Sequence, residues 1–262
     1  MQQEPRHGHR GTLDSAPRTA QLWERVTAAV DRRAKDVGRP LRIVDLGGGS
    51  GGLAVPLAEL GHEVLVVDPS PDALASLQRR AREASLDETG QRLRAVQGDS
   101  ATLAGLGLSG DVDLLTCHGV LELDDDPEGT VADIAAVLAP GGVLSLLVAQ
   151  RLAVVLARAL SGRFAQAKLA LESEDGRWGE HDPLPRRYDA DALGRLLRGV
   201  GLRVEDSRGL RVFTDLVPSA FVDTEADREA LLALERALAE HPDQELLGRL
   251  GSALHVLARR PV

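Results

Sequence analysis

Apolar and polar residues follow two different periods along residues 18–149, and their order predicts alternating strands and helices. Short apolar runs, typical of buried strands, occupy residues 41–46, 62–68, 93–99, 111–117 and 143–149. Apolar residues at helical spacing lie before and between them, at residues 18–35, 51–60, 71–85 and 127–138. Strands without a polar face, separated by helices, indicate a parallel sheet covered on both sides. We therefore expect an α/β fold with a doubly wound, mostly parallel sheet.

The pattern changes after residue 149. One apolar helix follows, and then the polar, proline-containing segment 172–188 predicts a loop or lid because it is too irregular for a strand. A helix at 189–200, capped near Asp189, leads to a strand at 202–213 with a bulge or turn at Gly209.

The last part of the chain predicts one more helix and a closing strand. Thr224 and Asp227 have the spacing of a helix start, and the residues expected to face inward from that helix are Leu231, Leu234 and Leu238. With a strand at 252–260, the sheet has seven strands and ends in an antiparallel pair.

Composition restricts the classes of function. The 262 residues carry a formal net charge of -9, which gives no general attraction to nucleic acid or to an anionic membrane. The single cysteine, Cys117, lies in an apolar stretch, cannot form an internal disulfide and cannot build a zinc site, which fits a reducing cytoplasm. The first residues lack the apolar core of a signal peptide. We expect a soluble cytoplasmic protein without a metal.

The segment VDLGGGSGG (44–52) places five glycines after Asp45 and predicts a loop that brings the backbone close to a small ligand. It contains the G-x-G-x-x-G spacing of a dinucleotide site at Gly47, Gly49 and Gly52. In such a site the helix start receives a pyrophosphate, which the carboxylate of Asp45 would repel. S-adenosylmethionine carries cationic groups and no phosphate, so it gains from the same carboxylate. The alternative is a capping or loop-bonding role for Asp45.

Three polar residues stand at the ends of the following predicted strands, where open α/β sheets bind ligands. Asp68 is placed to accept hydrogen bonds from ribose hydroxyls, in NAD and in S-adenosylmethionine alike. Asp99 can accept from an exocyclic adenine amine, and His118 ends the fourth strand. Structural roles stay open for all three, as a helix cap, a turn residue and a buried histidine respectively.

Four segments resemble, in order and spacing, the motifs of class I S-adenosylmethionine-dependent methyltransferases: DLGGGSG, VVDPSP, GDS and LAPGGVLSLL. The resemblance extends over almost the whole chain to the tRNA 5-carboxymethoxyuridine methyltransferase family, which esterifies a modified wobble uridine. That wider resemblance rests on GTLDSAPRTAQLW, CHGVLE, GLRVFTD and SALHVLARRP. It implies a Rossmann-like fold and S-adenosyl-L-methionine as the methyl donor.

The resemblance also implies a set of residues around the donor. They are Arg18, Gly47, Gly48, Asp68, Asp99, Ser100 and His118, to which the charge argument adds Asp45 and the loop spacing Gly49. Arg18 suits a bidentate pair with the methionine carboxylate. We expect a flexible arm (1–17), a cofactor-binding core (18–149), a lid and substrate-binding part (150–222), and a C-terminal helix and strand of the same domain (223–262).

The acceptor is the next question. A carboxylate acceptor is already ionised at pH 7 and needs no catalytic base, only a cation that orients it. Arg211 is the candidate catalytic residue for that task, and a strand-edge arginine is the alternative.

The acidic segment 172–182 stands where the family has lysines, which weakens the expectation of tRNA binding unless Arg186 and Arg187 compensate. A small-metabolite methyltransferase is therefore the alternative, and an NAD-dependent reductase and a noncatalytic binding module are the remaining ones. The sequence does not give the oligomeric state.

Overall fold

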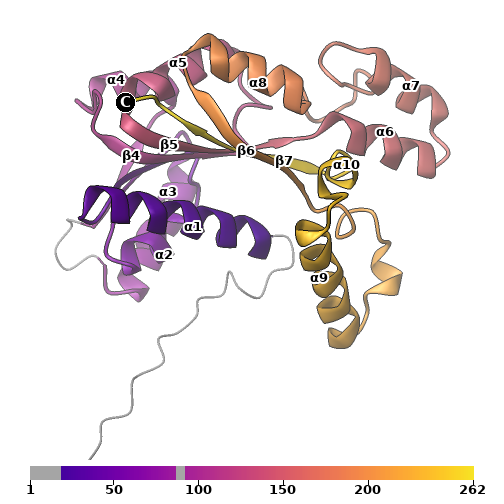
Figure 1. Cartoon of the computed structure of the whole chain (residues 1–262), viewed down its shortest axis with the longest axis horizontal. Helices are drawn as coiled ribbons and strands as arrows, with labels where there is room; N and C mark the ends of the chain where they lie inside the picture. Colours follow the sequence, from indigo (N-terminus) through magenta and orange to yellow (C-terminus); the bar gives the residue numbers. More distant parts are fainter. Residues whose placement is uncertain (1–18, 87–91) are drawn as a thin grey trace, which may run out of the picture.

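A seven-stranded sheet with helices on both faces organises the protein, in a computed structural model that describes residues 19–86 and 92–262 (Figure 1). The strands are β1 (Arg42–Leu46), β2 (Glu63–Asp68), β3 (Leu93–Gln97), β4 (Val112–His118), β5 (Leu138–Ala149), β6 (Arg203–Leu210) and β7 (Ala253–Arg259). Their order is β3-β2-β1-β4-β5-β7-β6. Strands β1 to β5 pair in parallel, whereas β7 runs antiparallel to both β5 and β6. The predicted doubly wound sheet with an antiparallel last strand is confirmed.

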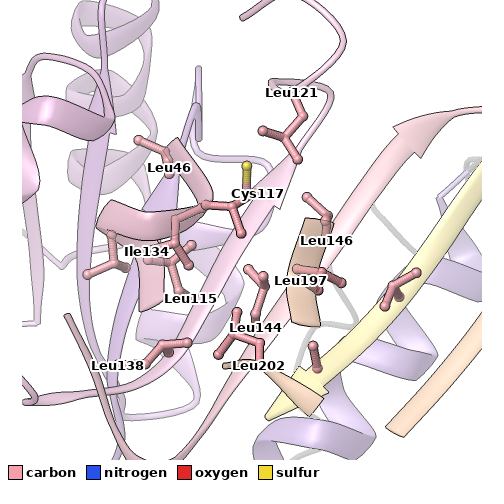
Figure 2. Close-up of a cluster of buried hydrophobic side chains, with 14 of the residues drawn as sticks. Leu46, Leu115, Cys117, Leu121, Ile134, Leu138, Leu144, Leu146, Leu197 and Leu202 are labelled. Atoms are coloured by element: carbon pink, nitrogen blue, oxygen red, sulfur yellow. The ribbon is translucent and has the colours of Figure 1, made fainter. Parts of the chain in front are cut away.

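Two helical layers cover the sheet. One face carries α1 (Ala20–Val37), α2 (Ala54–Glu59) and α3 (Pro71–Glu83). The other face carries α4 (Ser100–Gly105), α5 (Pro127–Val137) and α8 (Ala190–Gly199). Figure 2 shows the second core, where Leu115 and Leu146 of the central strands face Ile134 and Leu197 of the covering helices. Cys117 is fully buried there, and burial raises the pKa of its thiol, so it behaves as an apolar core residue.

The prediction of a single helix after β5 is wrong. The structure has α6 (Arg151–Leu160) and α7 (Phe164–Glu172), with a turn at Gly162, whose φ is 74°. Much of α7 faces solvent, and Phe164 is 72% exposed. The residues between the two helices are Ser161, Gly162 and Arg163, and the prediction of one helix ran across them.

The bulge in β6 lies between Val204 and Asp206, so the prediction of an irregularity at Gly209 is wrong. Gly209 has another task, because a Cβ there would stand 1.7 Å from the carbonyl oxygen of Gly248. That oxygen ends α10 (Gln244–Gly248), which packs against β6. The glycine permits close approach of two backbones.

The helix expected after Thr224 is α9 (Glu225–Glu240), preceded by a short turn of 3-10 helix at Ser219–Phe221. Its predicted start is confirmed by a capping box between Thr224 and Asp227. Its inward face is only partly as predicted, because Leu238 is buried but Leu234 is 48% exposed. Glu235 is buried in its place and accepts hydrogen bonds from the backbone at residues 213 and 214.

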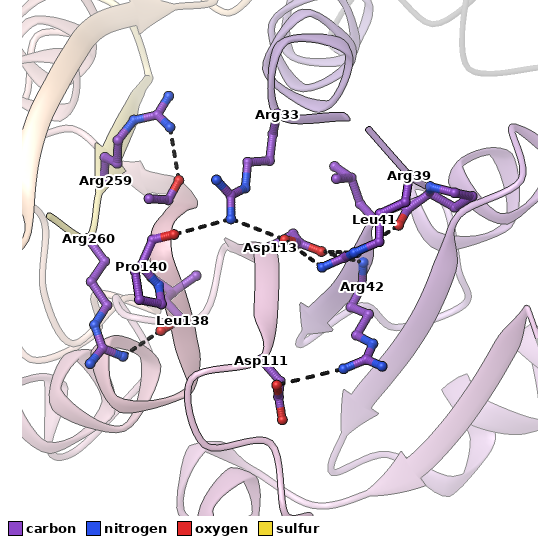
Figure 3. A network of polar contacts seen from close by, with 12 residues as sticks. Arg33, Arg39, Leu41, Arg42, Asp111, Asp113, Leu138, Pro140, Arg259 and Arg260 are labelled. Atoms are coloured by element: carbon purple, nitrogen blue, oxygen red, sulfur yellow. Dashed lines mark hydrogen bonds and ion pairs between the residues drawn. The ribbon is translucent and has the colours of Figure 1, made fainter. Parts of the chain in front are cut away.

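At the amino ends of the central strands, one buried carboxylate joins helix α1, the loop before β1 and strand β1 to strand β4 (Figure 3). Asp113 of β4 is fully buried and accepts from Arg33 of α1 at 3.2 Å, from Arg39 at 2.7 Å and from the backbone of Arg42 at 3.0 Å. This network lies at the edge opposite to the carboxyl ends of β1, β2 and β4. Within the described ranges, no helix has the length and apolar character that crossing a membrane requires.

Candidate functional site

A cavity of about 600 Å³ opens at the carboxyl ends of β1, β2, β3 and β4. It brings together five residues predicted from the sequence: Gly47, Asp68, Asp99, Ser100 and His118. These residues come from four different strand ends, and the parallel pairing of β1 to β4 is what aligns those ends at one edge. The doubly wound topology thus assembles the site.

The glycine loop follows β1 and is shaped by contacts within the protein. Gly47 has a φ of 70°, and its N–H donates to the carbonyl of Val67 at 2.7 Å. A Cβ at Gly47 would lie 2.3 Å from Val120, and one at Gly48 would lie 2.5 Å from a carboxyl oxygen of Asp45. No side chain therefore fits at either position, and the backbone of the loop stays open toward the cavity.

Asp68 holds the loop by two hydrogen bonds. One carboxyl oxygen accepts from the N–H of Gly49 at 2.8 Å and the other from the N–H of Ser70 at 2.9 Å. The cap of α3 is Ser70 itself, whose side chain accepts from Ala73, so the capping alternative for Asp68 is wrong. Each carboxyl oxygen keeps a second lone pair, with which Asp68 can accept from a ligand hydroxyl.

Asp45 lies beneath the loop and is 3% exposed. One of its carboxyl oxygens accepts from the Thr116 hydroxyl at 2.6 Å. Burial, and to a smaller extent the charge of Asp68, raise the pKa of Asp45 to about 6. Among the described residues no cationic side chain pairs with this carboxylate, so a positively charged ligand above the loop would stabilise its ionised form.

The end of β3 contributes Asp99 and Ser100. The Asp99 side chain forms a capping box with Thr102 at the start of α4, so it has a structural role as a helix cap, and not as the turn residue that the sequence left open. The Ser100 hydroxyl lies 2.6 Å from that of Thr130 on α5, which joins two walls of the cavity. Sequence reasoning missed three further carboxylates of the lining: Asp124, Asp126 and Asp133. The run DDDPEG was the only signal for Asp124 and Asp126, and Asp133 follows within the next helix.

His118 ends β4 and lines the cavity with its ring held from one side. Its Nε2 lies 2.9 Å from the Ser145 hydroxyl of β5. Its Nδ1 is enclosed and has no hydrogen-bond partner among the described residues. Burial lowers the pKa of His118 to about 4, so the ring is neutral at pH 7.

Arg211 lies in a second, smaller cavity of about 230 Å³ at the end of β5, together with Gln150 and Arg187. Its φ of 59° is in the left-handed region, which is unusual for a residue with a side chain. Glu122, in the loop after β4, accepts from the N–H of Ala149, which lines the smaller cavity, at 3.2 Å. Arg18 and the predicted arm lie outside the described residues.

The acidic segment is partly neutralised within the fold. Asp182 and Arg187 are both buried and form a two-bonded ion pair at 2.6 and 2.9 Å. The pKa of Asp182 is lowered by its hydrogen bonds from Arg187 and the backbone, which outweigh burial. Arg187 is therefore not available on the surface as a cation for a phosphate. Tyr188 is also buried and donates to the Leu121 carbonyl at 3.2 Å, which fixes this segment onto the loop after β4.

The acidic side chains that line the large cavity fit a cationic nucleoside. Besides Asp68, four carboxylates line the cavity: Asp99, Asp124, Asp126 and Asp133. Asp45 lies beneath the adjoining glycine loop. Such a surface favours a sulfonium and an ammonium group over a pyrophosphate. Among the residues in the described ranges, no cluster of histidine, cysteine and acidic side chains could hold a metal ion.

Comparisons with known proteins agree with this chemistry. Residues 44–144 match a family described as a methyltransferase domain. The chain is 30% identical over 252 residues to the tRNA 5-carboxymethoxyuridine methyltransferase of Escherichia coli (strain K12), covering 96% of this chain and 91% of that protein. It is 29% identical over 169 residues to the ubiquinone biosynthesis O-methyltransferase of Xanthomonas axonopodis pv. citri (strain 306), covering 64% and 65% respectively.

A solved structure shows the same fold. The magnesium protoporphyrin IX methyltransferase of Synechocystis PCC 6803, with bound S-adenosylhomocysteine, superposes with a TM-score of 0.58 at 17% identity. The superposition covers 97% of this chain and 90% of that one.

Proposed function

The chain belongs to the class I S-adenosylmethionine-dependent methyltransferases, and from this premise we propose that it esterifies the carboxylate of 5-carboxymethoxyuridine in tRNA. The observation that carries the proposal is the 30% identity over 96% of the chain to an enzyme of that name. The smaller cavity, which Arg211 lines, supports it, because a carboxylate acceptor needs a cation.

We assign the donor to the large cavity. Asp68 and Asp99 hold its adenosyl part through their free lone pairs, and the backbone of Gly47, Gly48 and Gly49 lets it approach the loop. Asp45 supplies negative charge from below, and Ser100 and His118 complete the walls. Arg18 is assigned to the same group from the sequence alone. The bound donor supplies a methyl group on a cationic sulfur.

Arg211 orients the acceptor. Its guanidinium can hold one oxygen of a carboxylate and leave the other oxygen free to attack. The carboxylate is ionised at pH 7, so the residues around it exclude water and align the reactants without removing a proton.

A small-metabolite acceptor is the second candidate. It is favoured by the buried Asp182–Arg187 pair and by the exposed acids of segment 172–182, both of which reduce attraction to a polyanion. The partial match to a ubiquinone biosynthesis O-methyltransferase supports the same alternative.

The test is transfer of a labelled methyl group to total small RNA and, separately, to a metabolite extract. We expect label in tRNA that mild alkali releases, since an ester is hydrolysed whereas an ether or N-methyl group is not. Arg211→Met should lower kcat/KM about 100-fold while the affinity for S-adenosylhomocysteine stays unchanged, and Arg211→Lys should retain part of the activity. Label confined to the metabolite fraction would support the second candidate and exclude the first.

A further inference from the structure

A chain of three hydrogen bonds runs from helix α1 through the sheet to the large cavity. Arg25 of α1 donates from Nε to Nδ1 of His255 on β7 at 2.8 Å. Nε2 of His255 lies 2.8 Å from the Ser145 hydroxyl on β5, and that hydroxyl lies 2.9 Å from Nε2 of His118 on β4. Ser145 and His255 are fully buried, so water does not compete for these bonds.

The position of each proton along this chain follows from Arg25. A guanidinium N–H can only donate, so Nδ1 of His255 must accept and Nε2 of His255 must carry the proton. That Nε2–H donates to the Ser145 oxygen, whose own hydrogen then points to Nε2 of His118. Nε2 of His118 accepts, and a neutral His118 therefore carries its proton on Nδ1.

Arg25 is fixed in the orientation that this order requires. Its Nη2 forms an ion pair with Asp206 of β6 at 2.8 Å, and its side chain is 16% exposed. The rings of His118 and His255 stand edge to face, with centroids 5.9 Å apart, so Ser145 can contact both through one oxygen. The chain thus begins at a permanent donor and ends at a ring that lines the cavity.

At that end, the Nδ1–H of His118 is a buried donor without a partner in the described part of the protein. A buried N–H without an acceptor is unfavourable, and a ligand that supplies the acceptor gains affinity. We propose that Arg25, His255 and Ser145 are positioning residues that fix His118 as an Nδ1–H donor to a ligand carboxylate. The expected effect of this hydrogen bond on ligand binding rests on the proposed function of the large cavity, whereas the position of the proton on the His118 ring does not.

The direct test is the protonation state of the His118 ring, measured by long-range nitrogen–proton NMR correlations on the full-length protein. We expect the Nδ1–H form in the wild type and a mixture of tautomers in Ser145→Ala and Arg25→Met. Arg25→Lys should restore the Nδ1–H form, because an ammonium is also a donor only. Arg33→Met is the matched control, since Arg33 lies on the same helix and contacts Asp113 and not a histidine. Thermal unfolding of each variant identifies loss of folding.

Two binding measurements identify the carboxylate. If it belongs to the cofactor, Ser145→Ala should weaken S-adenosylhomocysteine about tenfold but leave 5′-methylthioadenosine, which has no carboxylate, unaffected. If it belongs to the acceptor, both affinities stay constant and the KM for the acceptor rises about tenfold.

Three results would overturn the proposal. They are a wild-type His118 protonated on Nε2, a tautomer that does not respond to Ser145→Ala or Arg25→Met, or a changed tautomer with no change in any affinity or KM. The NMR result is independent of methyl transfer, so failure of the proposed function would leave it intact.

Discussion

Asp45 is the residue at which stability and binding oppose each other. It is buried beneath the glycine loop, and its pKa of about 6 stands above the usual 3.8. The folded state therefore binds its proton more tightly than the unfolded state, and stability decreases as pH rises from 4 through 6. We expect Asp45→Asn, which keeps the acceptor for Thr116, to raise the free energy of unfolding at pH 7 by up to about 3 kcal/mol. Urea denaturation at pH 7 and pH 3 measures this, and the difference should vanish at pH 3, below both pKa values.

The same group predicts how binding of the cationic donor depends on pH. Below pH 6 Asp45 becomes neutral and its attraction to a sulfonium is lost, whereas His118, with a pKa of about 4, stays neutral down to pH 5. Calorimetry from pH 7.5 to 5 should show a falling affinity for S-adenosylmethionine and a smaller change for uncharged-sulfur S-adenosylhomocysteine. In Asp45→Asn the additional pH dependence of the sulfonium compound should be absent. Parallel curves for both ligands in the wild type would contradict the role of Asp45.

At the scale of elements, α9 shows how a polar residue can determine which face of a helix is buried. Glu235 is 2% exposed and accepts from the N–H groups of Phe213 and Thr214 at 2.8 Å, and from the Thr214 hydroxyl at 2.7 Å. We expect Glu235→Ala to lower the free energy of unfolding by about 3 kcal/mol, because three donors lose their acceptor. The exposed neighbour Leu234 is the control, and Leu234→Ala should change stability by at most about 0.5 kcal/mol. Equal losses in both variants would contradict this account.

These elements also explain which parts of the structure the sequence predicted. The strand ends were predictable, because apolar runs followed by Asp68, Asp99 and His118 mark them directly. The prediction that Leu234 faces inward was wrong, because the spacing of apolar residues does not show that the carboxylate of Glu235 binds the backbone of a distant loop. The hydrogen bond from Arg25 to His255 leaves no signal in the local sequence, since the two residues are 230 positions apart and the order of the strands brings them together.

At the scale of the molecule, the two edges of the sheet differ in chemistry. The amino edge holds Asp113 among arginine donors, and the carboxyl edge holds the cavity. We expect Asp113→Ala to lower stability by about 3 kcal/mol, because it leaves Arg33 and Arg39 without their buried partner. Affinity for S-adenosylhomocysteine, measured below the unfolding transition, should remain within about twofold of wild type. A large loss of affinity in the folded variant would show that the edges are coupled.

The distribution of charge over the whole molecule decides between acceptors. The net charge is -9, and the exposed acids of segment 172–182 lie close in sequence to Leu184 and Arg187, which line the smaller cavity. If tRNA is the acceptor, these acids oppose its binding, so replacing Glu172, Glu174, Asp175 and Glu180 by their amides should raise tRNA affinity about tenfold at low salt. The matched control changes four exposed acids on α1 to α3, namely Asp31, Asp36, Glu59 and Glu83, and alters the net charge equally. A gain only in the variant of segment 172–182, with unchanged affinity for S-adenosylhomocysteine, supports a polyanionic acceptor that contacts this segment. Equal affinities in both variants would place tRNA elsewhere or favour the small metabolite.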